Sequence, residues 1–523
     1  MSVSTTHATV ADLLKAFSDA TPDRVDEEWQ RLVAAVWDGT TLWSGGELTD
    51  LSQSAVPVLI AELDRVGDDR KGYLAILLGL LAEAEYPATD GPVTAAVREG
   101  LDTYLGILAG AHKDQPLTLA LLYLLSHLPA DRDRILATAA PLGLDAPEQT
   151  RLERALADLD PAEPDLGRMW PSPSVWKLTD EEREFDREWI GALTPEQTLT
   201  NWQNDTRMVF GYAGAMAYWA VRHGMPVDLT DQATPADPVR NPAGDLDVAT
   251  FGQYAEQLRC PACHGALDFQ ESSVRCAACS ITYPLARGIL DLAEGINEDD
   301  GADVHEATAA LSQKLAELPS MGVYYESVLR PAYLRIAGAN WGGAVTPAEE
   351  DGYLTRHIRP NGGPILDLAA GAGRWTAVVA QTVGTERLIA LDMGLPMLTV
   401  LRGRLPEVPA VRASALDVPF ADESLGAVNC WNALQAFPDD AERAISEIGR
   451  ILRPGGTFTM MTFLFDTDLI VRHFQASHFF PSRPAGQLLF DRDEVGRWLS
   501  NAGMTVIQES NPGTFLFITA QKL

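Results

Sequence analysis

The chain has 523 residues, a hydrophobic content of 46% and a formal net charge of −33 at pH 7. Single hydrophobic cores seldom grow beyond ~250–300 residues, so this length predicts about three domains. The strong negative charge disfavours DNA and RNA partners, because their phosphates are bound through many Lys and Arg side chains. The longest apolar runs, residues 73–82 and 117–125, are shorter than the ~20 residues of a membrane span. With no signal-peptide pattern at the N-terminus, we expect a soluble cytoplasmic protein without membrane contact.

Residues 1–227 are predicted to form an all-α domain. Apolar residues recur at helical spacing in several segments, and Pro or Gly residues separate these segments. The segments are residues 56–66, 73–84, 93–108, 118–128 and 134–140. Residues 117–140 loosely resemble one pair of HEAT-type helical repeats, and an ordinary helical bundle is the alternative. Helical arrays of this kind bind a protein partner or shape a substrate pocket.

Four of the five cysteines form two C-x-x-C motifs that twelve residues separate, after a predicted linker at residues 228–250. The four cysteines are Cys260, Cys263, Cys276 and Cys279. Two such motifs can place four thiolates around a tetrahedral Zn²⁺, whereas disulfides are disfavoured in the cytosol. Residues 251–295 are similar to a small β zinc ribbon. Because four cysteines leave no open position for water, we expect a structural metal.

Residues 296–523 are predicted to form an α/β domain with a doubly wound sheet. The apolar strand 365–368 leads into a glycine turn, residues 369–373, that opens a helix. The next apolar strand ends in Asp392, 25 positions after Asp367. Dinucleotide-binding folds place an acid that accepts hydrogen bonds from ribose about 20 residues after the glycine motif. This spacing predicts a nucleoside pocket.

The last 200 residues or so resemble the Rossmann-like S-adenosylmethionine (SAM)-dependent methyltransferases. Four landmarks carry the resemblance, at residues 367–373, 418–425, 427–435 and 452–458. The single G-x-G favours SAM over NAD, because a third glycine at dinucleotide spacing is missing. The resemblance implies methyl transfer from SAM, with Tyr325 and Arg330 near the methionine carboxylate. The cofactor-binding residues that it implies are Asp367, Ala369, Gly371, Gly373, Asp392, Met393, Ser414, Ala415, Asn432, Tyr325 and Arg330.

Two positions depart from the pattern of this family. An acid that binds the adenine amino group commonly precedes an alanine in the third motif, whereas here Ser414 precedes Ala415. A neutral hydroxyl is a weaker acceptor than a carboxylate. Gly426 replaces a frequent aspartate. Ordinary variation within the family and a pocket diverted to another ligand are the two interpretations.

Three residues are candidates for direct chemistry. His473 and His478 lie in an insertion after the fifth predicted strand, and Gln435 follows the fourth. Ligands of doubly wound sheets bind beyond the carboxyl ends of the strands, and histidine removes protons near neutral pH. Methyl transfer depends mainly on alignment, so a base is optional. Surface positions for the two histidines are the alternative.

Three functions are compatible with these observations. The first is methylation of a small-molecule, carrier-bound or peptidyl intermediate in specialised metabolism, with the helical domain recognising the substrate. The second is a methyltransferase fold diverted to cyclisation or displacement. The third is a non-catalytic scaffold that binds a partner protein. We expect the first of these, with SAM and one structural zinc as cofactors.

Overall fold

A computed structural model describes residues 9–40, 46–164, 166, 180–227, 248–270, 273–293, 330–436, 440–477 and 489–523. The chain divides into two compact units. Unit 1 comprises residues 1–175, 183–229 and 466–487, and unit 2 comprises residues 176–182, 230–465 and 488–523. Residues 466–487 thus belong with the helical region, although the sequence placed them in the α/β domain. Within the described ranges, no helix combines the length and apolar character that a membrane crossing requires.

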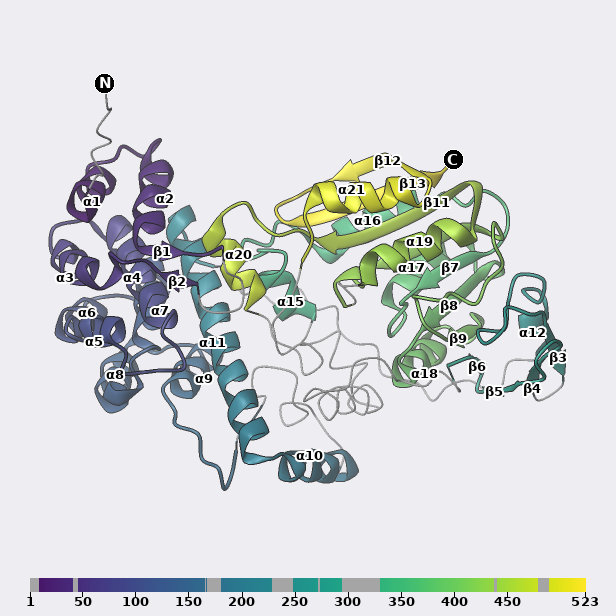
Figure 1. The fold of residues 1–523 in the computed structure, drawn as a ribbon, viewed down its shortest axis with the longest axis horizontal. Coiled ribbons are helices and arrows are strands. Elements are labelled where there is room, and N and C mark those ends of the chain that lie inside the picture. The colour runs from purple at the N-terminus through teal and green to yellow at the C-terminus, as the bar shows by residue number, and fades with distance from the viewer. Residues whose placement is uncertain are drawn as a thin grey trace. The chain divides into compact units, whose positions relative to one another are not determined.

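Unit 1 is built from helices, as predicted for the N-terminal region. They are α1 (Val10–Ser18), α2 (Val25–Val36), α3 (Ser52–Leu63), α4 (Asp68–Glu83), α5 (Pro92–Arg98), α6 (Leu101–Ala109), α7 (Pro116–Leu125), α8 (Arg132–Ala139), α9 (Ala146–Ala155) and α11 (Pro195–His223), with α10 (Asp180–Ala192) before α11. A short hairpin of β1 (Trp37–Asp38) and β2 (Glu47–Leu48) follows α2. Helices α4 and α7 are apolar on all sides, and every residue of 72–83 and 117–125 is buried. Because such helices need neighbours all round, they form the centre of unit 1 (Figure 1).

Helix α20 (Leu469–Ala476) explains why a late segment of the chain belongs to unit 1. The carboxylate of Asp468 caps this helix by accepting hydrogen bonds from the backbone N–H groups of residues 470 and 471. The helix packs against α11, and Figure 1 shows it in yellow-green beside the teal α11. A Cβ atom at Gly214 of α11 would lie 2.3 Å from the ring of Phe474. The glycine therefore makes the close packing possible.

Unit 2 contains one continuous sheet. Its strands are β3 (Leu267–Gln270), β4 (Ser273–Cys276), β5 (Thr282–Ala286), β6 (Ile289–Asp291), β7 (Ile365–Leu368), β8 (Leu388–Asp392), β9 (Ala410–Arg412), β10 (Leu425–Trp431), β11 (Leu452–Phe463), β12 (Met504–Ser510) and β13 (Phe515–Lys522). Their order is β12-β13-β11-β10-β7-β8-β9-β6-β5-β4-β3. Strands β7 to β11 are parallel, and β13 runs antiparallel to β11. The sheet is therefore mixed, with the crossover between β7 and β10 that a doubly wound fold requires.

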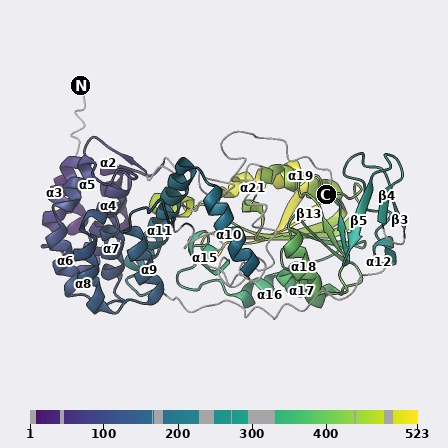
Figure 2. The same ribbon diagram turned by 90° about the horizontal axis from the view of Figure 1, so that it is seen from below.

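Helices cover both faces of this sheet. Figure 2 shows α16 (Pro347–His357), α17 (Arg374–Val383) and α18 (Leu395–Arg404) on one face, with α19 (Ala441–Ile451) and α21 (Arg492–Asn501) on the other. Every residue of β7 and β10 is buried. Parallel strands that are covered on both faces require such continuous apolar runs. The core of unit 2 thus holds the carboxyl ends of these strands in fixed positions.

The cysteine-containing segment is part of the same sheet. We call residues 258–292, which include β3 to β6, the four-cysteine module. Strand β6 pairs in parallel with β9 through residues 289–291 and 410–412. The backbone of Arg259 also donates a hydrogen bond to Pro419. The module therefore continues the α/β sheet instead of forming a separate body, which the sequence did not indicate.

Candidate active site

A pocket of about 370 Å³ opens at the carboxyl ends of β7, β8, β9 and β10. This edge lies at the crossover between β7 and β10, where doubly wound sheets bind their ligands. The predicted cofactor residues that line the pocket are Arg330, Ala369, Gly371, Asp392, Met393, Ser414, Ala415 and Asn432. Residues from five separate parts of the sequence thus meet in one pocket.

The glycine turn and Asp392 form one hydrogen-bonded unit. Gly371 and Gly373 have positive φ angles of 54° and 86°, which glycine adopts without strain. The N–H of Gly371 donates to Oδ2 of Asp392 at 2.8 Å, and the N–H of Gly394 donates to Oδ1 at 2.8 Å. Burial raises the pKa of the Asp392 carboxyl, whereas the backbone N–H groups act in the opposite direction. Each oxygen keeps a lone pair that can accept a ribose hydroxyl.

Asp367 has a different role from the one predicted. It is buried and does not line the pocket. Its carboxylate accepts hydrogen bonds from the hydroxyl of Thr376 and from Nδ2 of Asn429, the latter at 2.7 Å. These bonds join β7 to α17 and β10, so Asp367 supports the glycine turn from below the surface. Burial raises the pKa of Asp367 to about 6.

The structure gives a backbone reason for one of the two departures from the family pattern. A Cβ atom at Gly426 would lie 1.5 Å from the carbonyl oxygen of Gly362. Any larger residue would displace this backbone, so the glycine reflects local packing and not the cofactor pocket. Ser414 does line the pocket, and its Oγ accepts a hydrogen bond from the N–H of Leu416 at 3.1 Å. Ser414 is therefore the departure that faces a ligand.

Two tryptophans and a buried ion pair form the other end of the pocket. Arg330 pairs with Glu350, which is fully buried. The indole N–H of Trp431 donates to the same carboxylate at 2.9 Å. The guanidinium group of Arg330 lies 4.7 Å from the ring centre of Trp375. Glu350, Trp375 and Trp431 were not among the predicted site residues, although Trp375 lies two positions after the glycine turn.

Gln435 acts on the pocket through Asn432. Gln435 is buried, and its Nε2 donates to Oδ1 of Asn432 at 2.9 Å. The hydroxyl of Thr462 in turn donates to Oε1 of Gln435 at 3.1 Å. Asn432 lines the pocket with a positive φ of 57°. The structure therefore places Gln435 behind Asn432, where it can orient this side chain.

His473 lies in the interior of unit 1. Its side chain is 2% exposed, and its Nε2 lies 3.0 Å from a carboxylate oxygen of Glu83 on α4. The ring also contacts Trp37 edge-on, with ring centres 5.3 Å apart. This enclosure corrects the expectation that His473 is within reach of a substrate. His478 and Tyr325, also predicted as site residues, lie outside the described residues.

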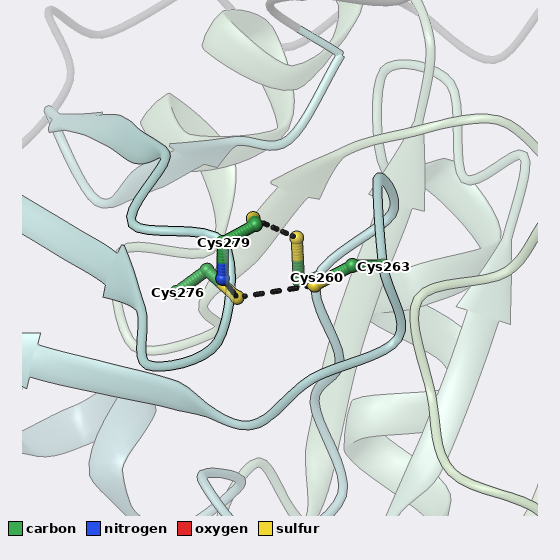
Figure 3. Close-up of side chains that lie close together, drawn as sticks. All are labelled: Cys260, Cys263, Cys276 and Cys279. Carbon is green, nitrogen blue, oxygen red and sulfur yellow. Dashed lines mark hydrogen bonds between the residues drawn. The ribbon is translucent and has the colours of Figure 1, made fainter.

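The sulfur atoms of the four-cysteine module converge. All four Sγ atoms lie within 4.8 Å of one another, and Figure 3 shows them pointing toward a common centre. Cys263 and Cys276 approach to 3.4 Å, and Cys260 and Cys279 to 3.6 Å. The residues after each motif, His264 and Ser280, have positive φ angles of 56° and 63°. The two turns thus have matching backbones, and their donor set fits a tetrahedral metal with four thiolate ligands.

Comparisons with known proteins agree with this geometry. Residues 365–456 match the sequence model of a family described as a methyltransferase domain. An uncharacterized chloroplastic methyltransferase of Arabidopsis thaliana is 28% identical over 231 residues, which are 40% of this chain and 62% of that protein. A malonyl-[acyl-carrier protein] O-methyltransferase of Methylococcus capsulatus is 36% identical over 111 residues, or 21% of this chain and 40% of that protein.

A solved structure of geranyl diphosphate C-methyltransferase from Streptomyces coelicolor is 15% identical, with a TM-score of 0.28, and covers 34% of this chain and 76% of that one. The chain spans less than two thirds of the length of the first Arabidopsis relative. The match at residues 365–456 confirms the prediction for the C-terminal region. Unit 2 therefore contains a SAM-dependent methyltransferase domain.

Proposed function

We propose that the protein transfers the methyl group of SAM to a small-molecule, carrier-bound or peptidyl acceptor in specialised metabolism. The pocket that joins the glycine turn, Asp392 and Ser414 is the observation that carries this proposal. Bound SAM supplies an electrophilic methyl group on its sulfonium centre. The acidic, helical unit 1 is the part of the chain that we assign to acceptor recognition.

Different residues of the pocket contact different parts of the cofactor. The backbone at Gly371 allows a close approach, and Asp392 accepts the ribose hydroxyls. Ser414 and Ala415 lie where the third motif of the family contacts adenine. Arg330 supplies positive charge for the methionine carboxylate, and Glu350 and Trp375 hold its guanidinium group in place. Asn432 lies at the end of β10, where Gln435 fixes its side chain next to an acceptor.

The pocket lining also limits the chemistry of the acceptor. Among its described residues there is no histidine, and Asp392 is the one carboxylate, with both oxygens bonded to backbone N–H groups. A general base is therefore not built into this part of the site. The arrangement favours acceptors that are nucleophilic as they bind, such as a carboxylate, an amine or a carbon activated by its neighbours. The likeness to a malonyl-carrier O-methyltransferase supports a carboxylate on a carrier.

Calorimetry with SAM and S-adenosylhomocysteine tests the cofactor assignment on the full chain. We expect saturable binding of both molecules at one site. Transfer of a labelled methyl group to a panel of carboxylate, amine and carrier-bound acceptors then tests the reaction. Absence of heat at millimolar SAM in a folded protein would refute the proposal and favour a diverted fold, for which Ser414 is the remaining argument.

We also propose that the four cysteines hold one structural Zn²⁺. The closed set of four thiolates leaves no position for a reacting water, and the module is tied to β9 of the methyltransferase sheet. Elemental analysis should find about one zinc per chain. The Cys276→Ser variant should lose the metal and unfold at lower temperature, with methyl transfer retained at permissive temperature. Less than about half an equivalent of zinc, with four freely titrating thiols, would contradict this assignment.

A further inference from the structure

Unit 1 contains a second cavity, which shares no residue with the cofactor pocket of unit 2. It has a volume of about 220 Å³ and lies among α4, α7, α9 and α11. Three aromatic rings, from Tyr86, Trp202 and Phe210, form part of its wall. Cavities for drug-sized ligands start at about 300 Å³. The volume therefore fits a ligand of one or two rings.

The aromatic rings of the wall are held in place by their neighbours. The rings of Tyr86 and Phe210 meet edge-on, with centres 5.3 Å apart. The guanidinium group of Arg154 lies 3.3 Å from the ring centre of Trp202, and that of Arg207 lies 5.6 Å from Tyr86. Rings fixed in this way provide flat apolar surfaces for another ring. The site is thus preorganised, which lowers the entropic cost of binding.

Two hydroxyl groups of the wall, those of Ser126 and Thr94, offer hydrogen-bond acceptors. The hydroxyl of Ser126 donates to the carbonyl of Tyr123 at 2.6 Å, and that of Thr94 donates toward the carbonyl of Ala82 at 3.5 Å. With their protons directed to the backbone, these hydroxyl oxygens are left with lone pairs. Both residues line the cavity. A ligand that donates an N–H group would match them.

His127 is the side chain that most clearly indicates a polar ligand in the cavity. It lines the cavity, is 4% exposed, and its Nε2 has no hydrogen-bond partner. The nearest carboxylate, on Glu83, lies 3.8 Å from Nε2, beyond hydrogen-bond distance. Burial lowers the pKa of His127 to about 4, so the ring is neutral and carries one acceptor nitrogen. A buried polar atom without a partner is unusual in a folded protein.

Charge around the cavity excludes strongly charged ligands. Asp158 lines the cavity and disfavours an anion. The guanidinium groups of Arg154 and Arg207 lie against two of the wall rings and disfavour a cation. We propose that this cavity binds an uncharged planar heteroaromatic ring with an N–H donor, of the indole type. Such a ring occurs in free metabolites and in peptide side chains.

Indole and benzofuran provide a matched pair of probes, because they share a shape and differ in the N–H group. Saturation-transfer NMR on the full chain should detect indole with a Kd of about 0.1–1 mM, as expected for so few atoms. Benzofuran should bind at least about fivefold more weakly, since it cannot donate a hydrogen bond. N-acetyltryptophanamide tests the peptide source: binding at least as tight as that of indole indicates a side chain, and loss of binding indicates a free metabolite.

Substitutions in and outside the cavity test where indole binds. Ala157 is half-buried and lines the cavity, whereas Ala137 on α8 is exposed and does not. Ala157→Leu should weaken indole binding at least tenfold, and Ala137→Leu should leave it unchanged. His127→Phe and Ser126→Ala test the polar contacts, and at least one should remove the preference for indole over benzofuran. Unchanged thermal unfolding serves as the folding control.

Two results would overturn the proposal. One is no binding of indole at millimolar concentration to the folded chain. The other is binding that Ala157→Leu leaves intact, which would place the ligand elsewhere. An unchanged indole preference in both polar variants would refute the assigned contacts. None of these measurements depends on methyl transfer, so failure of the proposed function would not affect them.

Discussion

Both units of the protein bury carboxylates in their interiors, and two of these carboxylates, Asp367 and Glu83, have different partners. Asp367 in unit 2 accepts hydrogen bonds from Thr376 and Asn429, both neutral. Glu83 in unit 1 contacts the hydroxyl of Tyr123 and Nε2 of His473, a side chain that can carry a positive charge.

The partners decide the direction of each pKa shift. Burial raises the pKa of Asp367 to about 6, because neutral donors only partly replace water. Burial also acts on Glu83, but the adjacent His473 and the hydrogen bonds outweigh it and lower the pKa of that carboxyl. The pKa of a buried carboxyl is therefore lowered where a histidine and a hydroxyl group face it, and raised where only neutral partners do. The four predictions below test this comparison and its extension to the cofactor pocket.

Removing the charge of Glu83 should have the largest effect. Glu83→Gln removes the buried carboxylate that Tyr123 and His473 contact, and breaking one side of a buried pair costs about 3–5 kcal/mol. The lowered pKa means that Glu83 stabilises the fold above the pKa of the unfolded chain, and that this contribution is lost as pH falls through the folded value. Urea unfolding at pH 7 measures the loss. Exposed Glu99 provides the control Glu99→Gln, and a loss below about 1 kcal/mol for Glu83→Gln would contradict a stabilising role of the buried carboxylate.

The opposite pH dependence is expected for Asp367. Its folded pKa of about 6 exceeds the value of about 3.9 of an exposed aspartate, so the native state binds more protons between these values. Its stabilising contribution is complete below about pH 4 and is lost as pH rises toward 6, by at most about 3 kcal/mol. Asp367→Asn should remove this dependence and leave unit 2 at least as stable at pH 7. A variant that keeps the wild-type slope between pH 4 and 6 would show that another group titrates there.

In the cofactor pocket, the carboxylate of Asp392 holds the glycine turn and is expected to act on a ligand as well. Asp392→Ala removes an acceptor of ribose hydroxyls and should weaken SAM binding about ten- to a hundredfold, or about 1.5–3 kcal/mol. Gly371→Val should weaken it further, because φ is +54° and the added side chain would enter the pocket. Calorimetry measures both variants. Ala137→Leu in unit 1 is the control, and unchanged SAM affinity in Asp392→Ala would place the ribose elsewhere.

The same contrast separates what the sequence could predict from what it could not. The spacing of the glycine turn and Asp392 indicated a shared pocket, and the resemblance to the methyltransferase family added Ser414 to it. Glu83 accepts from Tyr123 and contacts His473, which are 40 and 390 positions away in the chain. No local pattern encodes such pairs.

Three other misses have similar causes. The sequence predicted an insertion after the fifth strand but not that α20 completes the helical unit, because Gly214 and Phe474 reveal their fit only in contact. The role of Asp367 was misassigned because motif position does not distinguish a residue in the pocket from one directly beneath it. Glu350 belongs to no sequence motif. Only the fold places its carboxylate in contact with Arg330 and Trp431. Contacts within a motif could thus be predicted, whereas the ion pairs and packing between distant segments could not.

Substitution of Ser414 should change SAM affinity least, and it best distinguishes a SAM pocket from a pocket for another ligand. Its hydroxyl lines the pocket and already accepts one backbone N–H, so it is a neutral acceptor at a position where the family commonly has an acid. Ser414→Asp adds a charged acceptor for the adenine amino group. If the wild-type pocket binds SAM through Asp392 and the glycine turn, the gain should be no more than about tenfold, because charge strengthens a contact that serine already makes. Ser414→Ala is the matched control and should lose a similar factor. If SAM binding is undetectable in the wild type and measurable only in Ser414→Asp, the natural ligand of this pocket is not SAM.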